Sequence, residues 1–347
     1  MKVSILTYHD EDNYGATLQA YATYKTIEEI GFEVEFIDLK LCNPNGILFK
    51  LLLALKRAKF NRFRKKHFKN LTRTYLSVEE LQSDPPKSDC YLVGSDQTWN
   101  TNISKSLASA FFLDFGPDNV RRISYASSFG MDHFVETENL KTPKVQKLLS
   151  RFKSVLVRED DAVNICTSLW GINAKQVLDP VLLFENYDFL FSHKRTEKNQ
   201  LALYKIYPDD LFYDKSQLIA ESLKVRAKSI GSLRQKKGID CPYPCGIEEW
   251  INQIAASKYV LTDSFHGTVL SILYRRQFVV YVTNPDKVSR LRSLLDLLEL
   301  SDRICNPQTK IEDILALLNA PIDYDYVAKI LSVLRDESLN LLKKALE

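Results

Sequence analysis

The segment LTDSFHGTVL, residues 261–270, connects a predicted strand to a predicted helix. The run Tyr259–Thr262 is typical of a buried strand, and an apolar helical pattern follows the polar turn. Ser264 is a favourable N-cap for that helix, and Gly267 is a small residue for its first turn. The chain has only five histidines, and one of them, His266, falls in this turn. A strand, a polar turn and a helix in this order are typical of an α/β fold.

The alternation of strand and helix extends over most of the sequence. Residues 3–8 form a predicted strand, Tyr14 to Ile30 a helix, and Phe32 to Leu39 a second strand, which together make a βαβ unit. Further short apolar runs, typical of buried parallel strands, cover residues 90–93, 122–126, 154–157 and 176–178. The sequence therefore predicts parallel sheets covered by helices.

The pattern restarts after Asp179-Pro180, and 347 residues suffice for two domains. We predict two Rossmann-like, doubly wound α/β domains that face each other across a cleft. The N-terminal domain covers residues 1–185 and the C-terminal domain covers residues 195–320. A C-terminal helix covers residues 321–347, and the charged residues near 193–199 are the expected hinge.

The composition excludes several classes of protein. A hydrophobic share of 45% and a charged share of 26% are typical of a soluble globular chain. The net charge of +3 is too small to indicate a nucleic-acid partner. The longest apolar run, residues 47–55, is too short to span a membrane, and the N-terminus lacks the features of a signal peptide. We expect a cytoplasmic protein with reduced cysteines and no nucleic-acid partner.

Motifs for common cofactors are missing. No G-x-G-x-x-G follows the first predicted strand, so we do not expect a standard dinucleotide site. The pair Cys241 and Cys245 lacks the second pair of ligands that a zinc site needs. The D-x-D sequence of Asp323 and Asp325, which metal-dependent glycosyltransferases use, falls where an acidic helix cap belongs. We expect no metal.

Polar turns after predicted strands are the places where doubly wound sheets bind ligands. In the first turn, residues 13–20, Gly15 lets the backbone approach a ligand, or simply relieves strain in a capped helix. In the second, residues 94–100, hydrogen-bonding side chains adjoin Trp99. This pairing suits a sugar, whereas the alternative is a capping turn over a core tryptophan.

Two further turns carry cationic or titratable groups. Arg158 follows a buried strand, where its guanidinium either binds a phosphate or carboxylate or forms a salt bridge to Glu159 or Asp160. His266 lies at a helix N-terminus, which favours neutral imidazole. An anionic ligand there would raise its pKa and make it a general acid, whereas the alternative is a satisfied core histidine.

Taken together, these turns resemble those of the polysaccharide pyruvyl transferase family. The stretches that carry the resemblance are Asn13-Tyr14-Gly15-Ala16-x-Leu18-Gln19-Ala20-Tyr21-Ala22, Gly94-Ser95-Asp96-Gln97-x-Trp99-Asn100, Ser124-Tyr125-Ala126-x-Ser128-Phe129-Gly130, Arg158-Glu159, Leu178-Asp179-Pro180 and Thr262-Asp263-Ser264-Phe265-His266-Gly267-Thr268. Each stretch alone is a weak signal, but the six occur in the family's order.

The resemblance implies a glycosyltransferase-B type architecture, with the acceptor sugar on the N-terminal side and the donor on the C-terminal side. It implies transfer of a pyruvyl group from phosphoenolpyruvate to a sugar of a surface polysaccharide or its precursor, as a ketal, without a metal or organic cofactor. His266 is then the candidate acid or a phosphate ligand, Arg158 the first candidate for the donor anion, and Asp96 the candidate base. Arg290 and Arg292 come next as donor ligands, followed by Arg234 and Lys236.

We expect Arg158 and His266 to face the same cleft. Substrate contacts are expected from Asn13, Tyr14, Gly15, Gln19, Gly94, Ser95, Gln97, Trp99, Ser264, Phe265, Gly267 and Arg290. One departure from some relatives is that Ser264 stands where they carry arginine, so phosphate binding must rely on helix amides and a more distant arginine.

Residues 56–69 are the one strongly basic segment, with phenylalanines between the cations. An amphipathic helix here either rests on an anionic membrane surface, meets a lipid-diphosphate-linked glycan, or packs through its phenylalanines as a solvated helix. We favour packing, and otherwise expect peripheral contact at the inner face of the membrane.

Two other functions fit the same frame. One is a glycosyltransferase with a nucleotide-sugar donor, which an acidic residue near the end of a C-terminal-domain strand would favour for the ribose. The other is a glycan-binding protein that has lost catalysis, which the joint presence of His266, Arg158 and Asp96 argues against.

Overall fold

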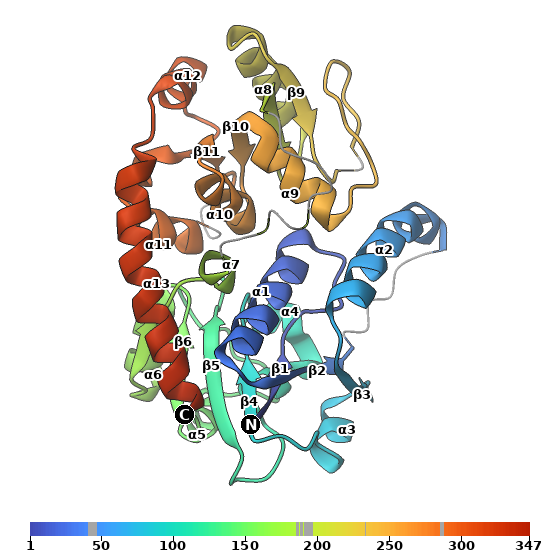
Figure 1. The fold of residues 1–347 in the computed structure, drawn as a ribbon, viewed down its shortest axis with the longest axis vertical. Coiled ribbons are helices and arrows are strands. Elements are labelled where there is room, and N and C mark those ends of the chain that lie inside the picture. Colours follow the sequence, from blue (N-terminus) through green and yellow to red (C-terminus); the bar gives the residue numbers. More distant parts are fainter. Residues whose placement is uncertain (41–46, 185–186, 188–189, 191–196, 233, 285–287) are drawn as a thin grey trace. The chain divides into compact units, whose positions relative to one another are not determined.

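The computed structural model describes residues 1–40, 47–184, 187, 190, 197–232, 234–284 and 288–347 (Figure 1). The chain divides into two compact units. Unit 1 comprises Met1–Gly46, Arg64–Phe184 and Ser332–Glu347, and unit 2 comprises Ile47–Phe63 and Glu185–Leu331. Each unit has a parallel sheet of its own.

In the described part of the chain, the sheet of unit 1 has seven strands in the order β3-β2-β1-β4-β5-β6-β7. These are β1 (Lys2–Leu6), β2 (Glu33–Leu39), β3 (Leu71–Tyr75), β4 (Cys90–Val93), β5 (Arg121–Ser127), β6 (Ser154–Val157) and β7 (Ala174–Gln176). All neighbouring strands are parallel, with Ile5 opposite Leu92 in the central pair. The strand order reverses between β1 and β4, so the turns after these strands form the topological switch point, where such sheets bind ligands.

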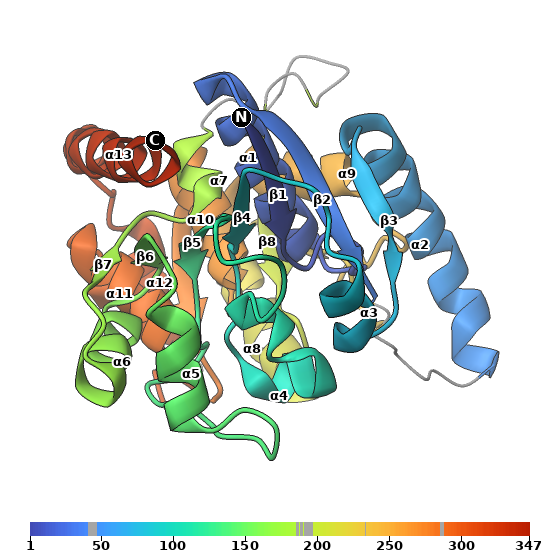
Figure 2. The same ribbon diagram turned by 90° about the horizontal axis from the view of Figure 1, so that it is seen from below.

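Helices cover both faces of this sheet. They are α1 (Tyr14–Ile30), α3 (Val78–Ser83), α4 (Thr101–Ser104), α5 (Thr142–Leu149), α6 (Asp160–Trp170) and α7 (Pro180–Leu183), with 3-10 turns η1 (Lys105–Leu107) and η2 (Ala110–Phe112). Figure 2 shows α1 and α7 on one side of the sheet and α4 and α5 on the other. The core on the side of α5 and α6 is rich in aromatic residues, among them Trp99, Phe112, Phe129 and Trp170.

The described part of unit 2 contains a five-stranded parallel sheet in the order β12-β11-β10-β8-β9. The strands are β8 (Lys198–Tyr204), β9 (Arg226–Ser229), β10 (Ser257–Thr262), β11 (Gln277–Tyr281) and β12 (Ile304–Cys305). The helices are α8 (Asp210–Ser222), α9 (Ile247–Ala256), α10 (Phe265–Leu273), α11 (Ser289–Leu297) and α12 (Ile311–Asn319), with the 3-10 turn η5 (Ser301–Arg303). Here the strand order reverses between β8 and β10, which makes the turns after these two strands the switch point of unit 2.

The predicted α/β class with two doubly wound units is confirmed. Two helices contribute residues to both units. The expected ranges 1–185, 195–320 and 321–347 do not divide these helices. The first part of α2 (Ile47–His67) belongs to unit 2, where Lys59 contacts Glu249 at 2.8 Å and the carbonyl of Pro244 at 3.0 Å. The expected hinge lies mostly outside the described residues, since 193–196 are not described.

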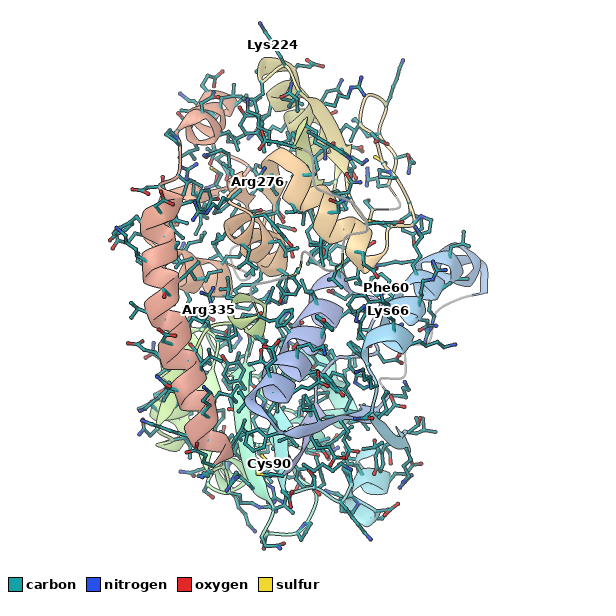
Figure 3. All side chains as sticks on the ribbon, in the orientation of Figure 1. Phe60, Lys66, Cys90, Lys224, Arg276 and Arg335 are labelled. Atoms are coloured by element: carbon teal, nitrogen blue, oxygen red, sulfur yellow. The ribbon has the colours of Figure 1, made fainter. Side chains whose placement is uncertain are left out.

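The long helix α13 (Tyr324–Leu346) begins in unit 2 and ends in unit 1. In unit 1 the hydroxyl of Ser338 accepts a hydrogen bond from the Leu178 amide at 3.0 Å. Arg335, which Figure 3 labels on α13, donates to the carbonyl of Leu182 at 2.8 Å. The C-terminal helix therefore contributes residues to both units.

The basic segment 56–69 packs through its aromatic side chains. Phe60, Phe63 and Phe68 are at most 5% exposed, so they are not available for insertion into a membrane. Figure 3 labels Phe60 and Lys66 on α2. The exposed cations of the segment are Arg57, Arg62, Lys65, Lys66 and Lys69. No helix in the described ranges has the length and apolar character that a membrane span requires.

Candidate functional site

The turns after β1 and β4 are tied together at the switch point of unit 1. The side-chain oxygen of Gln19 accepts a hydrogen bond from the Ser95 amide at 3.1 Å, and its nitrogen donates to Thr7 Oγ1 at 2.8 Å. Thr7 in turn donates to the carbonyl of Ser95 at 3.2 Å. Gln19 is fully buried. Its amide group is committed to these bonds, so Gln19 fixes the two turns relative to each other. The expected substrate contact of Gln19 stays a prediction.

The glycine and serine that open the second turn are also fixed by packing. Gly94 has φ +117°, and a Cβ there would lie 2.1 Å from the carbonyl oxygen of Tyr125, so no side chain fits. The hydroxyl of Ser95 lies 3.0 Å from Asp179 Oδ2 and is fully buried. Both residues therefore position the turn within the sheet, and the expected direct contact of Gly94 and Ser95 with substrate stays a prediction.

Arg158 lies at the centre of a buried charge cluster. Its Nη1 donates to Asp179 Oδ2 at 2.9 Å, its Nη2 lies 3.3 Å from Asp96 Oδ1, and its Nε lies 3.7 Å from Glu159 Oε2. Burial lowers the pKa of the guanidinium, but Asp96, Asp179 and Glu159 more than offset this, so the net shift is upward. The salt bridge expected as the alternative is present, and the arginine is engaged by carboxylates on several sides.

Asp96 is the member of this cluster that reaches solvent. Its side chain is 15% exposed, against 2% for Arg158, 1% for Glu159 and 0% for Asp179. Asp96 adopts φ +70°, a conformation that aspartate tolerates better than most residues. Its carbonyl accepts a hydrogen bond from the Ser128 amide at 2.9 Å, which ties the turn to the end of β5. The cluster thus presents one oriented carboxylate at the switch point.

Trp99 is buried and does not offer the stacking surface for a sugar that was expected from the sequence. The ring is 1% exposed, stacks on Phe112 at 5.3 Å, and its Nε1 donates to the carbonyl of Phe111 at 2.9 Å. It is a core residue beneath the turn, because the surrounding aromatic core covers it. Gln97 is only partly buried, and its side-chain oxygen accepts a hydrogen bond from Asn100 at 2.9 Å.

The first polar turn is a capped helix start. Asn13 is exposed and its side chain caps α1 by accepting a hydrogen bond from the Ala16 amide at 3.2 Å. Tyr14 and Gly15 are buried in the first turn of the helix. Asn13 therefore remains accessible to a ligand, whereas Tyr14 and Gly15 are covered.

In unit 2, the turn after β10 is built as the sequence predicts. Ser264 is the N-cap of α10 and accepts from the Gly267 amide at 3.3 Å. A Cβ at Gly267 would lie 2.5 Å from Thr262 Oγ1 and 2.9 Å from Tyr204 Cδ1. The glycine is thus required by close packing of the helix on the sheet.

His266 is buried, with 5% of its surface exposed. Every residue of α10 from Phe265 to Ile272 is buried, so a side chain in its first turn is covered as well. The ring packs edge-on against Phe265, with centroids 5.3 Å apart. The expected approach of Arg158 and His266 joins the two units and stays a prediction.

The remaining candidate cations differ in their surroundings. Arg290 is partly buried in the first turn of α11. Arg234 pairs with Asp210 at 2.6 Å, and Lys236 pairs with Asp214 at 2.5 Å. The hydrogen bond that Lys236 donates to Asp214 raises the pKa of Lys236. The cations of the 234–236 segment are therefore engaged by α8.

Three further charged residues, for which no catalytic or substrate-binding role is expected from the sequence, lie at strand ends or helix starts. Glu159 accepts a hydrogen bond from the Phe129 amide at 3.1 Å, and Asp179 caps α7 by accepting from the Val181 amide at 3.0 Å. Lys205 is the first residue after β8 and its side chain is 2% exposed. Lys205 could have been found by the sequence feature that identified Arg158, namely a cationic residue directly after a buried strand.

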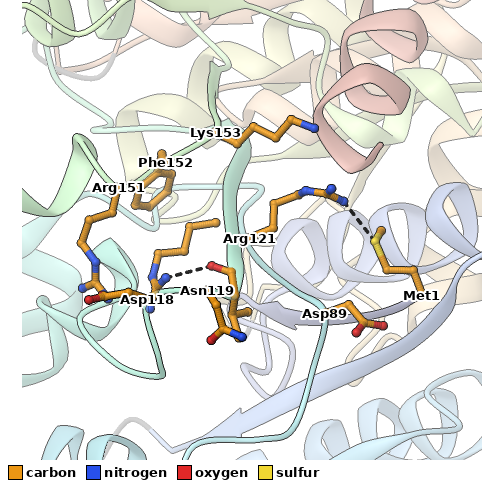
Figure 4. A pocket seen from close by; sticks show the side chains of 10 residues that line it. Met1, Asp89, Asp118, Asn119, Arg121, Arg151, Phe152 and Lys153 are labelled. Carbon is orange, nitrogen blue, oxygen red and sulfur yellow. Dashed lines mark hydrogen bonds and ion pairs between the residues drawn. The ribbon is translucent and has the colours of Figure 1, made fainter.

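A pocket of about 590 Å³ lies at the opposite end of the unit 1 strands, beside the starts of β5 and β6 (Figure 4). Its lining comprises Met1, Asp89, Asp118, Asn119, Val120, Arg121, Arg122, Arg151, Phe152 and Lys153. Arg122 is held by carbonyl groups, including that of Phe115 at 2.7 Å, and Arg151 by Asp118 at 2.9 Å. The pocket is therefore separate from the switch point and its residues.

Among the described residues, no group of three or more histidine, cysteine, aspartate or glutamate side chains is placed to hold a metal ion. Cys241 and Cys245 are free thiols, and burial raises the pKa of Cys245 to about 12. Asp323 caps α13 by accepting from the Tyr326 amide at 3.0 Å. The D-x-D sequence is thus used as a helix cap.

Comparison with solved structures identifies the fold. The chain matches UDP-GlcNAc 2-epimerase from Methanocaldococcus jannaschii over 96% of its own length and 99% of that chain, with a TM-score of 0.54 and 11% identity. It matches the epimerase from Neisseria meningitidis over 98% and 99%, with a TM-score of 0.55 and 10% identity. Arabidopsis thaliana UGT89C1 matches over 98% of both chains, with a TM-score of 0.55 and 9% identity. The chain has the glycosyltransferase-B fold.

The family follows from the sequence itself. The profile of the polysaccharide pyruvyl transferase family matches residues 13–285, which is most of the chain. The chain therefore belongs to this family, and the predicted resemblance is confirmed. No curated protein matches the chain significantly.

Proposed function

We propose that the protein transfers a pyruvyl group from phosphoenolpyruvate to a sugar of a surface polysaccharide or its precursor and forms a cyclic ketal. The observation that carries this proposal is the placement of the family's motifs. Residues 94–97 follow β4 at the switch point of unit 1, and residues 263–267 follow β10 at the switch point of unit 2. Both motifs thus occupy the positions where doubly wound sheets bind ligands.

The chemistry requires an acid and a base. A proton added to the methylene carbon of phosphoenolpyruvate leaves an electron-poor carbon, to which a sugar hydroxyl adds as it gives up its proton. The bond to phosphate then breaks, and a second hydroxyl of the sugar attacks, loses its proton and closes the ketal. The phosphate group leaves as inorganic phosphate.

We assign these roles to residues of the two switch points. His266 is the proposed acid, since its place in the first turn of α10 lets an anionic donor favour its protonated form. Asp96 is the proposed base, because it is the accessible carboxylate of its cluster. Asn13 and Gln97 are the proposed contacts to the sugar, as both retain exposed surface.

Arg158 is better suited to positioning Asp96 than to binding the donor. An incoming phosphate would meet Asp96, Glu159 and Asp179 around a single guanidinium, and like charges in a buried site repel strongly. We therefore propose Arg158 as a positioning residue. Arg290, in the first turn of α11, is the proposed donor contact on that helix.

We further propose that the acceptor is lipid-linked and that α2 meets its anionic part. Arg62, Lys65 and Lys66 are exposed and spaced three and four residues apart, so they share one face of the helix. Because the phenylalanines of the segment are buried, this contact rests on charge alone.

The decisive experiment is incubation with phosphoenolpyruvate and a panel of glycosides, including lipid-diphosphate-linked ones. The expected result is release of inorganic phosphate together with a product carrying a ketal-linked pyruvyl group by mass. Parallel reactions with UDP-sugars test glycosyl transfer. Glycosylated products from UDP-sugars, with no phosphate release from phosphoenolpyruvate, would overturn the proposal.

A further inference from the structure

Lys205 carries a buried ammonium group that the chain holds only loosely. Its side chain is 2% exposed. Among the described residues, Nζ lies 3.4 Å from Asp209 Oδ2 and 3.3 Å from Thr283 Oγ1. Both distances are at the long end of hydrogen bonding, whereas a buried charge normally needs short, well-made bonds. Nζ also lies 5.1 Å from the ring centroid of Phe212.

A second lysine nearby shows what a satisfied ammonium looks like in the same surroundings. Lys215 lies over the ring of Tyr281 at 5.6 Å, as Lys205 does at 5.8 Å. Its Nζ donates to the carbonyls of Pro307 and Thr309, each at 2.7 Å. The ammonium group of Lys215 thus makes short hydrogen bonds within the protein. Since both lysines lie over Tyr281, this ring does not explain why the hydrogen bonds of Lys205 are longer.

The position of Lys205 relates it to the turn that carries His266. Lys205 directly follows β8, and β8 and β10 form the switch point of unit 2. The amide of Ile206 donates to Asp263 Oδ1 at 3.1 Å, which fastens the turn after β8 to the turn after β10. The side chain of Asp209 is 52% exposed, and Thr283 is exposed too, so both partners of Nζ face solvent.

We propose that Lys205 binds the phosphate or carboxylate group of the donor. This inference rests on the proposed function and adds a cation on the side where Ser264 supplies none. Asp209 neutralises Lys205 while no donor is bound. When a donor binds, its anionic group neutralises Lys205 instead. The nearby Asp209 carboxylate then repels the bound anion and weakens its binding.

The test compares binding of phosphoenolpyruvate and of inorganic phosphate to the full chain by calorimetry. Lys205→Met should weaken both by about tenfold or more, the range of charge-assisted hydrogen bonds. Lys205→Arg should retain part of the affinity. Lys215→Met is the matched control, because it removes a neighbouring lysine whose bonds are all internal, and it should bind as the wild type does.

Asp209 supplies a variant with the opposite sign. Asp209 Oδ1 accepts from the Phe212 amide at 2.7 Å as the N-cap of α8, and serine can replace that function. Asp209→Ser therefore keeps the cap, removes the competing carboxylate and should tighten anion binding. Asp210→Ser, which removes an exposed carboxylate of the same helix, is its control and should change affinity less.

The outcomes separate the inference from the proposed function. If the wild type binds phosphoenolpyruvate and Lys205→Met binds it equally, the role of Lys205 is wrong and the function stands. If the wild type binds phosphate alone, and Lys205→Met loses it, the donor is wrong and the anion site stands. Failure of the wild type to bind either anion overturns both. If Lys205→Met does not fold, weaker binding by Asp209→Ser overturns the inference, and tighter binding supports it.

Discussion

The guanidinium of Arg158 donates to the carboxylate of Asp179 at 2.9 Å, and the two side chains are 2% and 0% exposed. Removing one partner from such a buried pair leaves an uncompensated charge. Asp179 also caps α7 and lies 3.0 Å from the hydroxyl of Ser95, so the pair joins the end of β6 to the turn after β4. The cluster is thus a structural element of the site as well as a chemical one.

We therefore expect Arg158→Met to lower the free energy of unfolding by about 3–5 kcal/mol. Arg158→Lys should lose less, because it keeps the charge while losing the planar fork. The measurement is denaturant unfolding followed by circular dichroism. The control is Arg151→Met, which breaks the ion pair of Arg151 with Asp118. Because the side chain of Asp118 is 94% exposed, this substitution should lower the free energy of unfolding by no more than about 1 kcal/mol. Equal effects of the two substitutions at 158 and 151 would refute the importance of the cluster.

His266 is the residue whose loss should abolish turnover without abolishing donor binding. His266→Asn is expected to lower the rate of phosphate release from phosphoenolpyruvate by about 10²–10⁴, the usual range for loss of a general acid. Calorimetry of phosphoenolpyruvate binding should show a smaller change. A variant that turns over at the wild-type rate would exclude His266 as the acid.

How far the sequence predicts the fold depends on whether each element carries a local pattern. The buried strands of the first sheet, and β10 of the second, were predicted from their apolar runs. β3 was missed because its residues Leu71–Tyr75 are mostly exposed at a sheet edge and have no such run. The first part of α2 belongs to unit 2, where Lys59 contacts Glu249, and no local sequence pattern indicates this contact.

The site shows the same division between local and non-local signals. The turns 94–100 and 261–270 were recognised from their composition, and the structure places them at the two switch points. Trp99 was misread because the polar residues around it favour a binding surface, while its burial comes from Phe112 and other residues distant in sequence. Lys205 was overlooked although it follows a strand as Arg158 does, because no family motif surrounds it.

Gly267 tests the close packing of α10 on the sheet. Gly267→Ala should destabilise the protein by about 1–3 kcal/mol, because its Cβ would lie 2.5 Å from Thr262 Oγ1 and the core must shift. Gly246→Ser, at the N-cap of α9, places a Cβ no closer than 3.6 Å to Lys59 and should have little effect. Thermal unfolding of both variants checks this, and a neutral Gly267→Ala would contradict the packing.

His67 at the end of α2 should make stability depend on pH. Burial, together with Lys66 and Lys25, lowers its pKa from 6.5 to about 4. The unfolded chain therefore binds a proton at a higher pH than the folded chain, so stability falls as the pH drops from about 6.5 toward 4. His67→Gln should remove part of this slope between pH 6.5 and 5, whereas His133→Gln, at an exposed position, should keep it. Unfolding midpoints that follow the same pH slope in His67→Gln and the wild type would show that His67 does not titrate in this way.

The exposed cations of α2 should bind anionic membranes through charge alone. We expect the wild type to float with anionic liposomes at low salt and to be released at high salt, because the attraction is screened. The triple variant Arg62→Glu, Lys65→Glu and Lys66→Glu should no longer float. The control triple variant Lys141→Glu, Lys144→Glu and Lys147→Glu reverses the same number of exposed charges elsewhere and should still float. If both triple variants fail to float, net charge rather than the position of these cations accounts for the binding. If the wild type still floats at high salt, apolar groups and not these cations bind the membrane.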